Sequence, residues 1–159
     1  FPGRQPRGRD RFNSALNYGY GVLYNEVERA CLYVGLDPYL GLYHSERYGK
    51  PALVLDLVEE FRVPVVDSAI FPLFLSKTLT RMSNYVRDAA GNYTLGPEGK
   101  RHVVAAVYQR LNHIVPWAGR RLPVKTVIQY QARAIGWIFL ARKKTYTPFS
   151  YRLMPDTHA

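Results

Sequence analysis

Apolar residues in the segment from Asn13 to Gly35 recur every three or four positions, which is the period of an α-helix with one buried face. Asn13 is a favourable N-cap, and Gly35 supplies the stop that commonly ends a helix. The predicted buried face comprises Leu16, Gly19, Val22, Leu23, Val27, Ala30, Cys31 and Val34. The pattern therefore predicts one long helix of about six turns.

Proline and charge mark the next elements. Asp37 and Pro38 are typical of a short helical turn, which we expect to run through Leu42. Residues 52–61 are apolar on one side and acidic on the other, which predicts a helix. A strand over ALVLDLV is the weaker alternative, because the acidic run continues directly after it.

The remaining apolar segments also favour helices. The segment that starts at Pro64 is expected to kink or break before Pro72. Pro97 begins a helix that runs to about Ile114, and Pro123 begins the last helix. Turn residues in 83–96 predict a loop or a short hairpin.

These elements predict an all-α fold in one domain. Residues 1–12 hold four arginines, two prolines and two glycines, so we interpret them as a basic linker or arm. Residues 13–152 form the predicted helical domain, and residues 153–159 a flexible tail. The aromatic residues just before that tail suggest that part of this region packs on the domain.

The net charge of the chain indicates which kind of partner it binds. The chain has 22 Lys and Arg against 12 Asp and Glu, a net charge of +10. A balance this basic favours nucleic acid or another anionic surface as partner, although a generically cationic protein is the plain alternative. Cys31 is the single cysteine, which excludes an intrachain disulfide and favours a buried apolar role in a reducing compartment. No apolar run is long enough to span a bilayer.

One histidine and a group of carboxylates carry the candidate chemistry. His44 is followed by Asp56, Glu59 and Glu60, and Asp56 and Glu59 share a helix face because they are three residues apart. Imidazole and carboxylates together can hold Mg²⁺ or Mn²⁺, and such an ion polarises a phosphate and activates a hydroxyl. The alternative is a solvated acidic face with a surface histidine.

Several separated motifs favour the metal site over a solvated acidic face. The segments ALNYGYGVLYNEVERA, GLDPYLGLYH, KPALVLDLVEEFR and GNYTLGPEGKRHVVAAVYQRLN, then QAR and YTPF, occur in this order. Together they closely resemble the catalytic domain of the CRISPR-associated integrase that captures new spacers, the first Cas protein. The resemblance covers roughly residues 3–152.

This resemblance implies a metal-dependent DNA integrase and endonuclease of CRISPR antiviral defence. In that family a protospacer 3′-hydroxyl attacks a phosphodiester of the repeat DNA, and related nuclease (hydrolase) activity accompanies this transesterification. The implied metal ligands are His44 and Glu59, with Asp56 supporting the site; Glu60 has no assigned metal role. The implied partners are double-stranded and branched DNA, a second copy in a homodimer and the second Cas protein. A prokaryotic cytoplasm, with no membrane partner, is the implied location.

One family feature is missing. The family's first metal ligand is a glutamate in an Arg-Gly-x-Glu-Gly type motif, and neither that motif nor the family's N-terminal β domain occurs here. Glu26 and Glu28 lie in a later helix and do not match it. We therefore expect residues 1–159 alone to be weakly active or inactive.

Further residues near the candidate site have two interpretations each. Tyr24 could orient a phosphate near the metal or simply pack. Arg47 and Lys50 either contact DNA as neighbours of His44 or are plain surface charge. Arg62 either contacts DNA or pairs with Glu59 or Glu60. Trp117 and Trp137 are interpreted as core or dimer anchors and not as platforms on which bases stack.

Two other functions remain as alternatives to an integrase. One is a catalytically incomplete DNA-binding scaffold of the adaptation complex. The other is an unrelated helical nucleic-acid-binding regulator, which explains the basic charge but leaves the spacing of His44, Asp56 and Glu59 unexplained.

Overall fold

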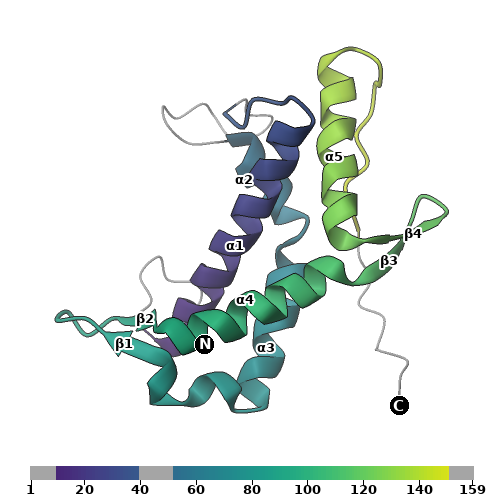
Figure 1. The fold of residues 1–159 in the computed structure, drawn as a ribbon. Helices are drawn as coiled ribbons and strands as arrows, with labels where there is room; N and C mark the ends of the chain where they lie inside the picture. The colour runs from purple at the N-terminus through teal and green to yellow at the C-terminus, as the bar shows by residue number, and fades with distance from the viewer. Residues whose placement is uncertain (1–9, 40–51, 151–159) are drawn as a thin grey trace.

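Helices dominate the residues that the computed structural model describes, which are 10–39 and 52–150 (Figure 1). The α-helices in this part of the chain are α1 (Arg11–Tyr33), α2 (Ala52–Glu59), α3 (Ser68–Leu75), α4 (Pro97–Asn112) and α5 (Val124–Phe139). The strands are β1 (Tyr85–Arg87), β2 (Tyr93–Leu95), β3 (Ile114–Trp117) and β4 (Arg120–Pro123), and they form two separate antiparallel hairpins. The predicted all-α class is confirmed.

The first helix starts earlier than the sequence pattern predicts. Asp10, not Asn13, is the N-cap, because its carboxylate accepts the backbone N–H of Asn13 at 2.8 Å. Asn13 lies inside α1 and donates its own side-chain amide to Asp10. The end of α1 is as predicted, since Gly35 follows the C-cap with a φ of 79°.

The connection from α1 to α2 is only partly described. Asp37 accepts the N–H of Tyr39 at 2.9 Å, which forms a turn at Pro38. The rest of the short helix predicted through Leu42 lies outside the described residues. Residues 52–59 are helical, so the weaker strand interpretation of this segment is wrong.

A kink or a break was predicted before Pro72, and the structure shows that the break is wrong. A π-helical segment, η1 (Arg62–Asp67), leads into α3, and α3 continues through Pro72. Proline has no N–H for the carbonyl four residues earlier, which is that of Ser68. The guanidinium of Arg110 donates to that carbonyl at 3.3 Å, so the carbonyl keeps a hydrogen-bond partner.

Both hairpins lie beside α4, one at each end. The β1–β2 hairpin confirms the prediction for residues 83–96. The β3–β4 hairpin was not predicted, and it shortens α4, which ends at Asn112 instead of about Ile114. Its two-residue turn, Ala118 and Gly119, has positive φ at both positions, as a type I′ turn requires.

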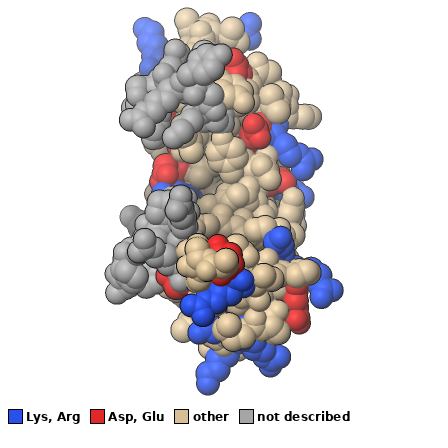
Figure 2. Space-filling model, turned by 90° about the vertical axis from the view of Figure 1, so that its left-hand side faces the viewer, with Lys and Arg blue, Asp and Glu red and all other residues tan. Residues whose placement is uncertain are grey.

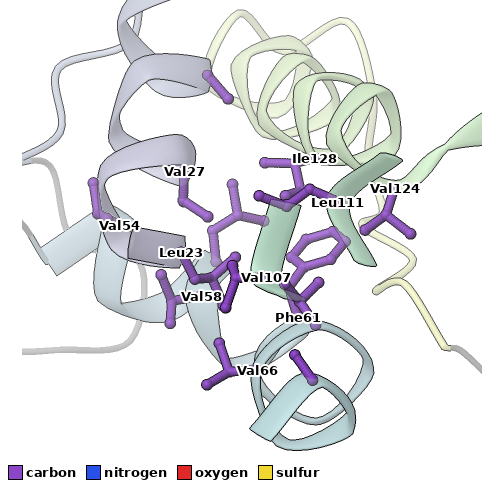
Figure 3. Packing of buried hydrophobic residues seen from close by; sticks show 14 of the residues in the cluster. Leu23, Val27, Val54, Val58, Phe61, Val66, Val107, Leu111, Val124 and Ile128 are labelled. Carbon is purple, nitrogen blue, oxygen red and sulfur yellow. The ribbon is translucent and has the colours of Figure 1, made fainter. Parts of the chain in front are cut away.

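The core forms where the helices converge (Figure 3). Leu23 and Val27 of α1, Phe61 after α2, Leu111 of α4 and Ile128 of α5 are all at most 1% exposed. Burial of such side chains stabilises the fold by roughly 1.5–3 kcal/mol each. Cys31 is fully buried in this core, as predicted, and burial raises the pKa of its thiol to about 11.

The arrangement of the helices leaves α1 in the middle. It packs on α2, η1, α4 and α5, while α4 crosses it and the β3–β4 hairpin projects beyond (Figure 1). The chain after α5 runs back along that helix, and Phe149 stacks on Phe61 with ring centroids 5.1 Å apart. Packing of the region before the tail is therefore confirmed for these residues. None of the helices in the described ranges is long and apolar enough to cross a membrane.

A buried glycine at the start of α4 provides a stability test. A Cβ at Gly99 would lie 2.5 Å from the backbone oxygen of Asn84, whereas a Cβ at Gly21 on α1 would meet nothing within 4 Å. We expect Gly99→Ala to lower the free energy of unfolding by about 1–3 kcal/mol, because the clash is with backbone. The matched Gly21→Ala should raise it by up to about 1 kcal/mol through helix propensity. Urea unfolding measures both, and an unchanged midpoint for Gly99→Ala would contradict the packing described.

Candidate metal and nucleic-acid site

One strip of α2 carries the predicted carboxylate ligands. Ala52, Leu53, Val54, Leu57 and Val58 are buried, so only the remaining positions of this helix reach the surface. These include Asp56, which is partly exposed, and Glu59, which is exposed. The sequence prediction that these two carboxylates share a face opposite a buried apolar face is confirmed.

The loop that carries His44 leaves and re-enters the fold beside this helix. The N–H of Leu53 donates to the carbonyl of Pro38 at 3.2 Å, which holds the two described ends of the loop together. His44, Arg47 and Lys50 lie outside the described residues, so their predicted roles remain predictions.

Glu59 has a cation partner in the structure. Both of its carboxylate oxygens accept from the guanidinium of Arg62 at 2.8 Å. The same guanidinium lies over the ring of Tyr20 on α1, 4.7 Å from the centroid. The Tyr20 hydroxyl in turn donates to Asp67 at 2.5 Å. Of the two pairings considered for Arg62, the structure therefore shows the one with Glu59.

The electrostatics of this group favour charge on Arg62. Partial burial lowers the pKa of Arg62, but its hydrogen bonds with Glu59 and Tyr20 outweigh that effect, and the pKa is raised overall. The pKa of Tyr20 is raised by burial and by Asp67. A cation is thus held on one side of Glu59, while 59% of the Glu59 side chain remains exposed.

Tyr24 lies one turn further along α1 and is partly buried. Its pKa is raised, first by burial and then by Glu28 and Tyr39. Tyr39 is the last described residue before the loop that contains His44. Tyr24 therefore lies near Tyr39, where the described chain ends before His44. This position is compatible with both interpretations of Tyr24, which are orienting a phosphate and packing.

Glu60 has a different environment from its neighbour. It accepts a hydrogen bond from the Tyr146 hydroxyl, one from the backbone N–H of Phe149 at 2.7 Å and one from the Gln131 amide at 3.3 Å. Burial raises the pKa of Glu60, and these hydrogen bonds oppose that rise. Its carboxylate joins α2, α5 and the C-terminal segment, so the absence of a predicted metal role is consistent with this use.

This connection was missed at the level of sequence. Gln131 belongs to the QAR motif, and Tyr146 and Phe149 belong to YTPF, but nothing in their spacing shows that they meet Glu60. The available signal was the position of Glu60. It follows the exposed Glu59 and directly precedes Phe61, which is fully buried.

Charges of both signs lie around the α2 side of the molecule. Figure 2 shows Asp and Glu side chains interspersed with Lys and Arg on one face, with no uniformly basic surface. No group of three or more His, Cys, Asp or Glu side chains that could hold a metal occurs in residues 10–39 and 52–150. Within these ranges, Asp56 and Glu59 offer the hard oxygen ligands that Mg²⁺ and Mn²⁺ prefer, and they fit such an ion as part of a larger ligand set.

Comparison with known proteins identifies the class. The family model for the CRISPR associated protein Cas1 matches residues 1–109. A CRISPR-associated endonuclease Cas1 of Thermus thermophilus is 40% identical over 94% of this chain and 47% of its own length. One from Methanospirillum hungatei is 36% identical over 96% of this chain and 45% of its own.

Solved structures agree with the sequence matches. A casposase bound to an integration product superposes with a TM-score of 0.85 at 31% identity, over 90% of this chain and 41% of its own. A Cas1 protein from Thermotoga maritima shares the fold, with a TM-score of 0.72 at 21% identity, over 82% of this chain and 41% of its own.

The fold and these matches define a CRISPR-associated protein with a helical domain. The chain belongs to the Cas1 family, and the resemblance seen in its motifs is confirmed. It spans about half the length of the curated relatives described above.

The adjacent glutamates give a matched test of the Glu60 connection. Glu60→Ala removes the common acceptor of three partly buried hydrogen bonds, so we expect a loss of about 2–4 kcal/mol in the free energy of unfolding. Glu59→Ala breaks only an exposed ion pair and should cost less than about 1 kcal/mol. Urea unfolding of both variants measures the difference, and equal losses would show that Glu60 does not fasten these elements.

Proposed function

We propose that the intact protein is a metal-dependent DNA integrase and endonuclease of CRISPR spacer acquisition, and that this chain supplies its helical catalytic domain. Membership of the Cas1 family supports the assignment. The similarity to a casposase bound to an integration product supports strand transfer as the reaction. The observation that carries the proposal is the exposed strip of Asp56 and Glu59 beside the root of the His44 loop.

Chain length allows His44 to join that strip. Six extended residues from Pro38 reach up to roughly 20 Å. Glu59 lies seven residues into α2, which is about 10 Å along the helix axis from its start. The imidazole of His44 can therefore meet the carboxylates of Asp56 and Glu59 without moving either described end of the loop.

In this proposal His44, Asp56 and Glu59 hold one Mg²⁺ or Mn²⁺. The ion supplies Lewis-acid activation of the attacking hydroxyl and of the scissile phosphate. Strand transfer forms one phosphorus–oxygen bond to the incoming 3′-oxygen and breaks one to the leaving 3′-oxygen, and the proton passes from the attacking hydroxyl to the leaving group. In the same proposal, Tyr24 orients the phosphate or the leaving oxygen.

Cations near this strip have two tasks in the proposal. Arg62 holds Glu59 with both oxygens turned to one side, and it is close enough to the strip to contact a bound phosphate. Arg47 and Lys50, in the His44 loop, add positive charge near the same place. Negative charge that develops on the transferred phosphate is stabilised by such fixed cations.

The proposed partners follow from the same family. They are double-stranded and branched DNA, a second copy of the protein and the second Cas protein, Cas2. Solved complexes of Cas6-RT-Cas1 with Cas2 contain chains of this fold, at 21% and 22% identity. With a metal-dependent reaction on cellular DNA, the proposed location is the prokaryotic cytoplasm.

A catalytically incomplete DNA-binding scaffold is the second candidate. The observation in its favour is the ion pair of Glu59 with Arg62, which occupies both oxygens of the principal predicted ligand. A metal ion at Glu59 would have to displace Arg62 or share Glu59 with it. A DNA-binding scaffold needs no metal ion there.

Two substitutions in the intact protein separate these functions. With Mn²⁺ or Mg²⁺ and a branched DNA, we expect His44→Ala and Glu59→Ala each to lower strand joining and cleavage at least about 100-fold, because each removes a proposed ligand. DNA affinity and its salt dependence should remain close to wild type, since neither residue is a cation that binds phosphate. Gel assays of product formation and anisotropy titrations give the two readouts.

The control is Glu26→Ala, because Glu26 is an acidic residue of α1 that pairs with Arg29 and Tyr108 away from α2. It should retain full activity. Wild-type activity in His44→Ala and Glu59→Ala would overturn the metal site. A wild-type protein that binds branched DNA but never joins or cleaves it would favour the scaffold.

A further inference from the structure

The π-helical segment η1 brings two opposite charges to one face. It begins at the cation Arg62 and ends at the anion Asp67. On an α-helix, two side chains five residues apart would point about 140° away from each other. A π-helix instead bonds each residue to the one five positions along, so the two ends of η1 come to the same face. Such turns are uncommon and occur frequently at functional sites.

Tyr20 of α1 contacts both ends of η1. The Arg62 guanidinium lies over its ring, 4.7 Å from the centroid, and its hydroxyl donates to Asp67 at 2.5 Å. Asp67 occupies the N-cap position of α3, but its side chain makes no capping hydrogen bond there. The Asp67 carboxylate accepts from Tyr20 instead, so one tyrosine joins the cation to the anion.

Core packing holds Tyr20 close to η1. The preceding residue, Gly19, is buried, and a Cβ there would lie 2.9 Å from Cγ1 of Val66 in η1. Glycine therefore allows α1 and η1 to approach each other closely at this point. Val66 is fully buried, so the contact belongs to the core. The position of Tyr20 relative to η1 is set by this packing and not by exposed side chains alone.

The last contact in this series is the one between Arg62 and Glu59. Nη1 of Arg62 lies 2.8 Å from both carboxylate oxygens of Glu59, so the orientation of the carboxylate follows that of the guanidinium. An ion pair between two freely exposed side chains contributes less than about 1 kcal/mol and would not fix an exposed glutamate. Only 25% of the Arg62 side chain is exposed, however, and Tyr20 lies against it. The Arg62 guanidinium is therefore a fixed donor to Glu59.

We propose that Tyr20 and Asp67 are positioning residues for the metal ligand Glu59, and that they act through Arg62. The inference rests on the proposed function, because it takes Glu59 as a ligand. Groups that hydrogen-bond to a ligating carboxylate orient it, and their loss typically lowers metal affinity about 10–100-fold. Each carboxylate oxygen has two lone pairs, so Glu59 can accept from Arg62 and still bind a metal ion.

Substitutions of Tyr20 test this role without changing the net charge of the site. In the intact protein we expect Tyr20→Leu to weaken Mn²⁺ binding by about tenfold, because the guanidinium loses both the ring and the link to Asp67. Tyr20→Phe keeps the ring and removes only the link to Asp67, so it should weaken Mn²⁺ binding by about threefold. Electron paramagnetic resonance of free Mn²⁺ gives the affinity and needs neither DNA nor turnover.

Tyr18→Leu is the matched control. Tyr18 is another partly buried tyrosine of α1, and it also has a cation near its ring, the ammonium of Lys100 at 5.8 Å from the centroid. Two residues apart on a helix, Tyr18 and Tyr20 point to nearly opposite sides. Tyr18→Leu should therefore leave Mn²⁺ affinity within about twofold of wild type. Urea unfolding of each variant shows that it is folded.

A double substitution shows whether Tyr20 acts through Glu59. In a Glu59→Ala background, Tyr20→Leu should cause no further loss of Mn²⁺ affinity, because the carboxylate to be positioned is gone. A further loss of about tenfold would overturn the positioning role, as would wild-type affinity in Tyr20→Leu alone or equal losses in Tyr20→Leu and Tyr18→Leu. Wild-type affinity in Glu59→Ala, or a wild-type protein that binds no Mn²⁺, would instead overturn the proposed metal site and the positioning role with it.

Discussion

The carboxylate of Glu60 is the point at which the separate parts of this domain are joined. It ends the acidic run of α2, yet it accepts hydrogen bonds from Gln131 of α5 and from Tyr146 and Phe149 beyond that helix. A partly buried carboxylate is costly unless donors surround it, and here three donors from distant segments do so. Phe149 is thereby held against Phe61, which closes the core over the end of α2.

Two neighbouring glutamates thus perform opposite tasks. Glu60 points inward and joins three segments of the fold through its hydrogen bonds. Glu59 points outward, is exposed to solvent and pairs with Arg62. Arg62 is itself held over Tyr20, and the Tyr20 hydroxyl is bound to Asp67. A pre-positioned carboxylate loses less conformational entropy on binding a cation than a freely rotating one.

Charge is divided unevenly along the chain. Eleven of the twelve acidic residues precede Gly99, and they include those of α2. The segment from Gly99 to Ser150 contains Lys and Arg but no Asp or Glu. The Gln131–Glu60 hydrogen bond links the cationic segment after Gly99 to the part of the chain that holds the acidic residues.

Local periodicity determined much of this protein. The buried face of α1, the helix at residues 52–59 and the shared face of Asp56 and Glu59 followed from the sequence, because side-chain spacing along a helix is fixed by its geometry. The motifs also indicated the family correctly. Non-local contacts decided the rest. Arg110 donates to the carbonyl that Pro72 leaves without a partner, and Gln131 and Tyr146 converge on Glu60. The cap was decided by a local competition, in which Asp10 and not Asn13 accepts the free backbone N–H. No pattern in the sequence encodes such pairs, because the partners lie tens of residues apart or compete equally for one position, and only packing of the whole chain selects among them.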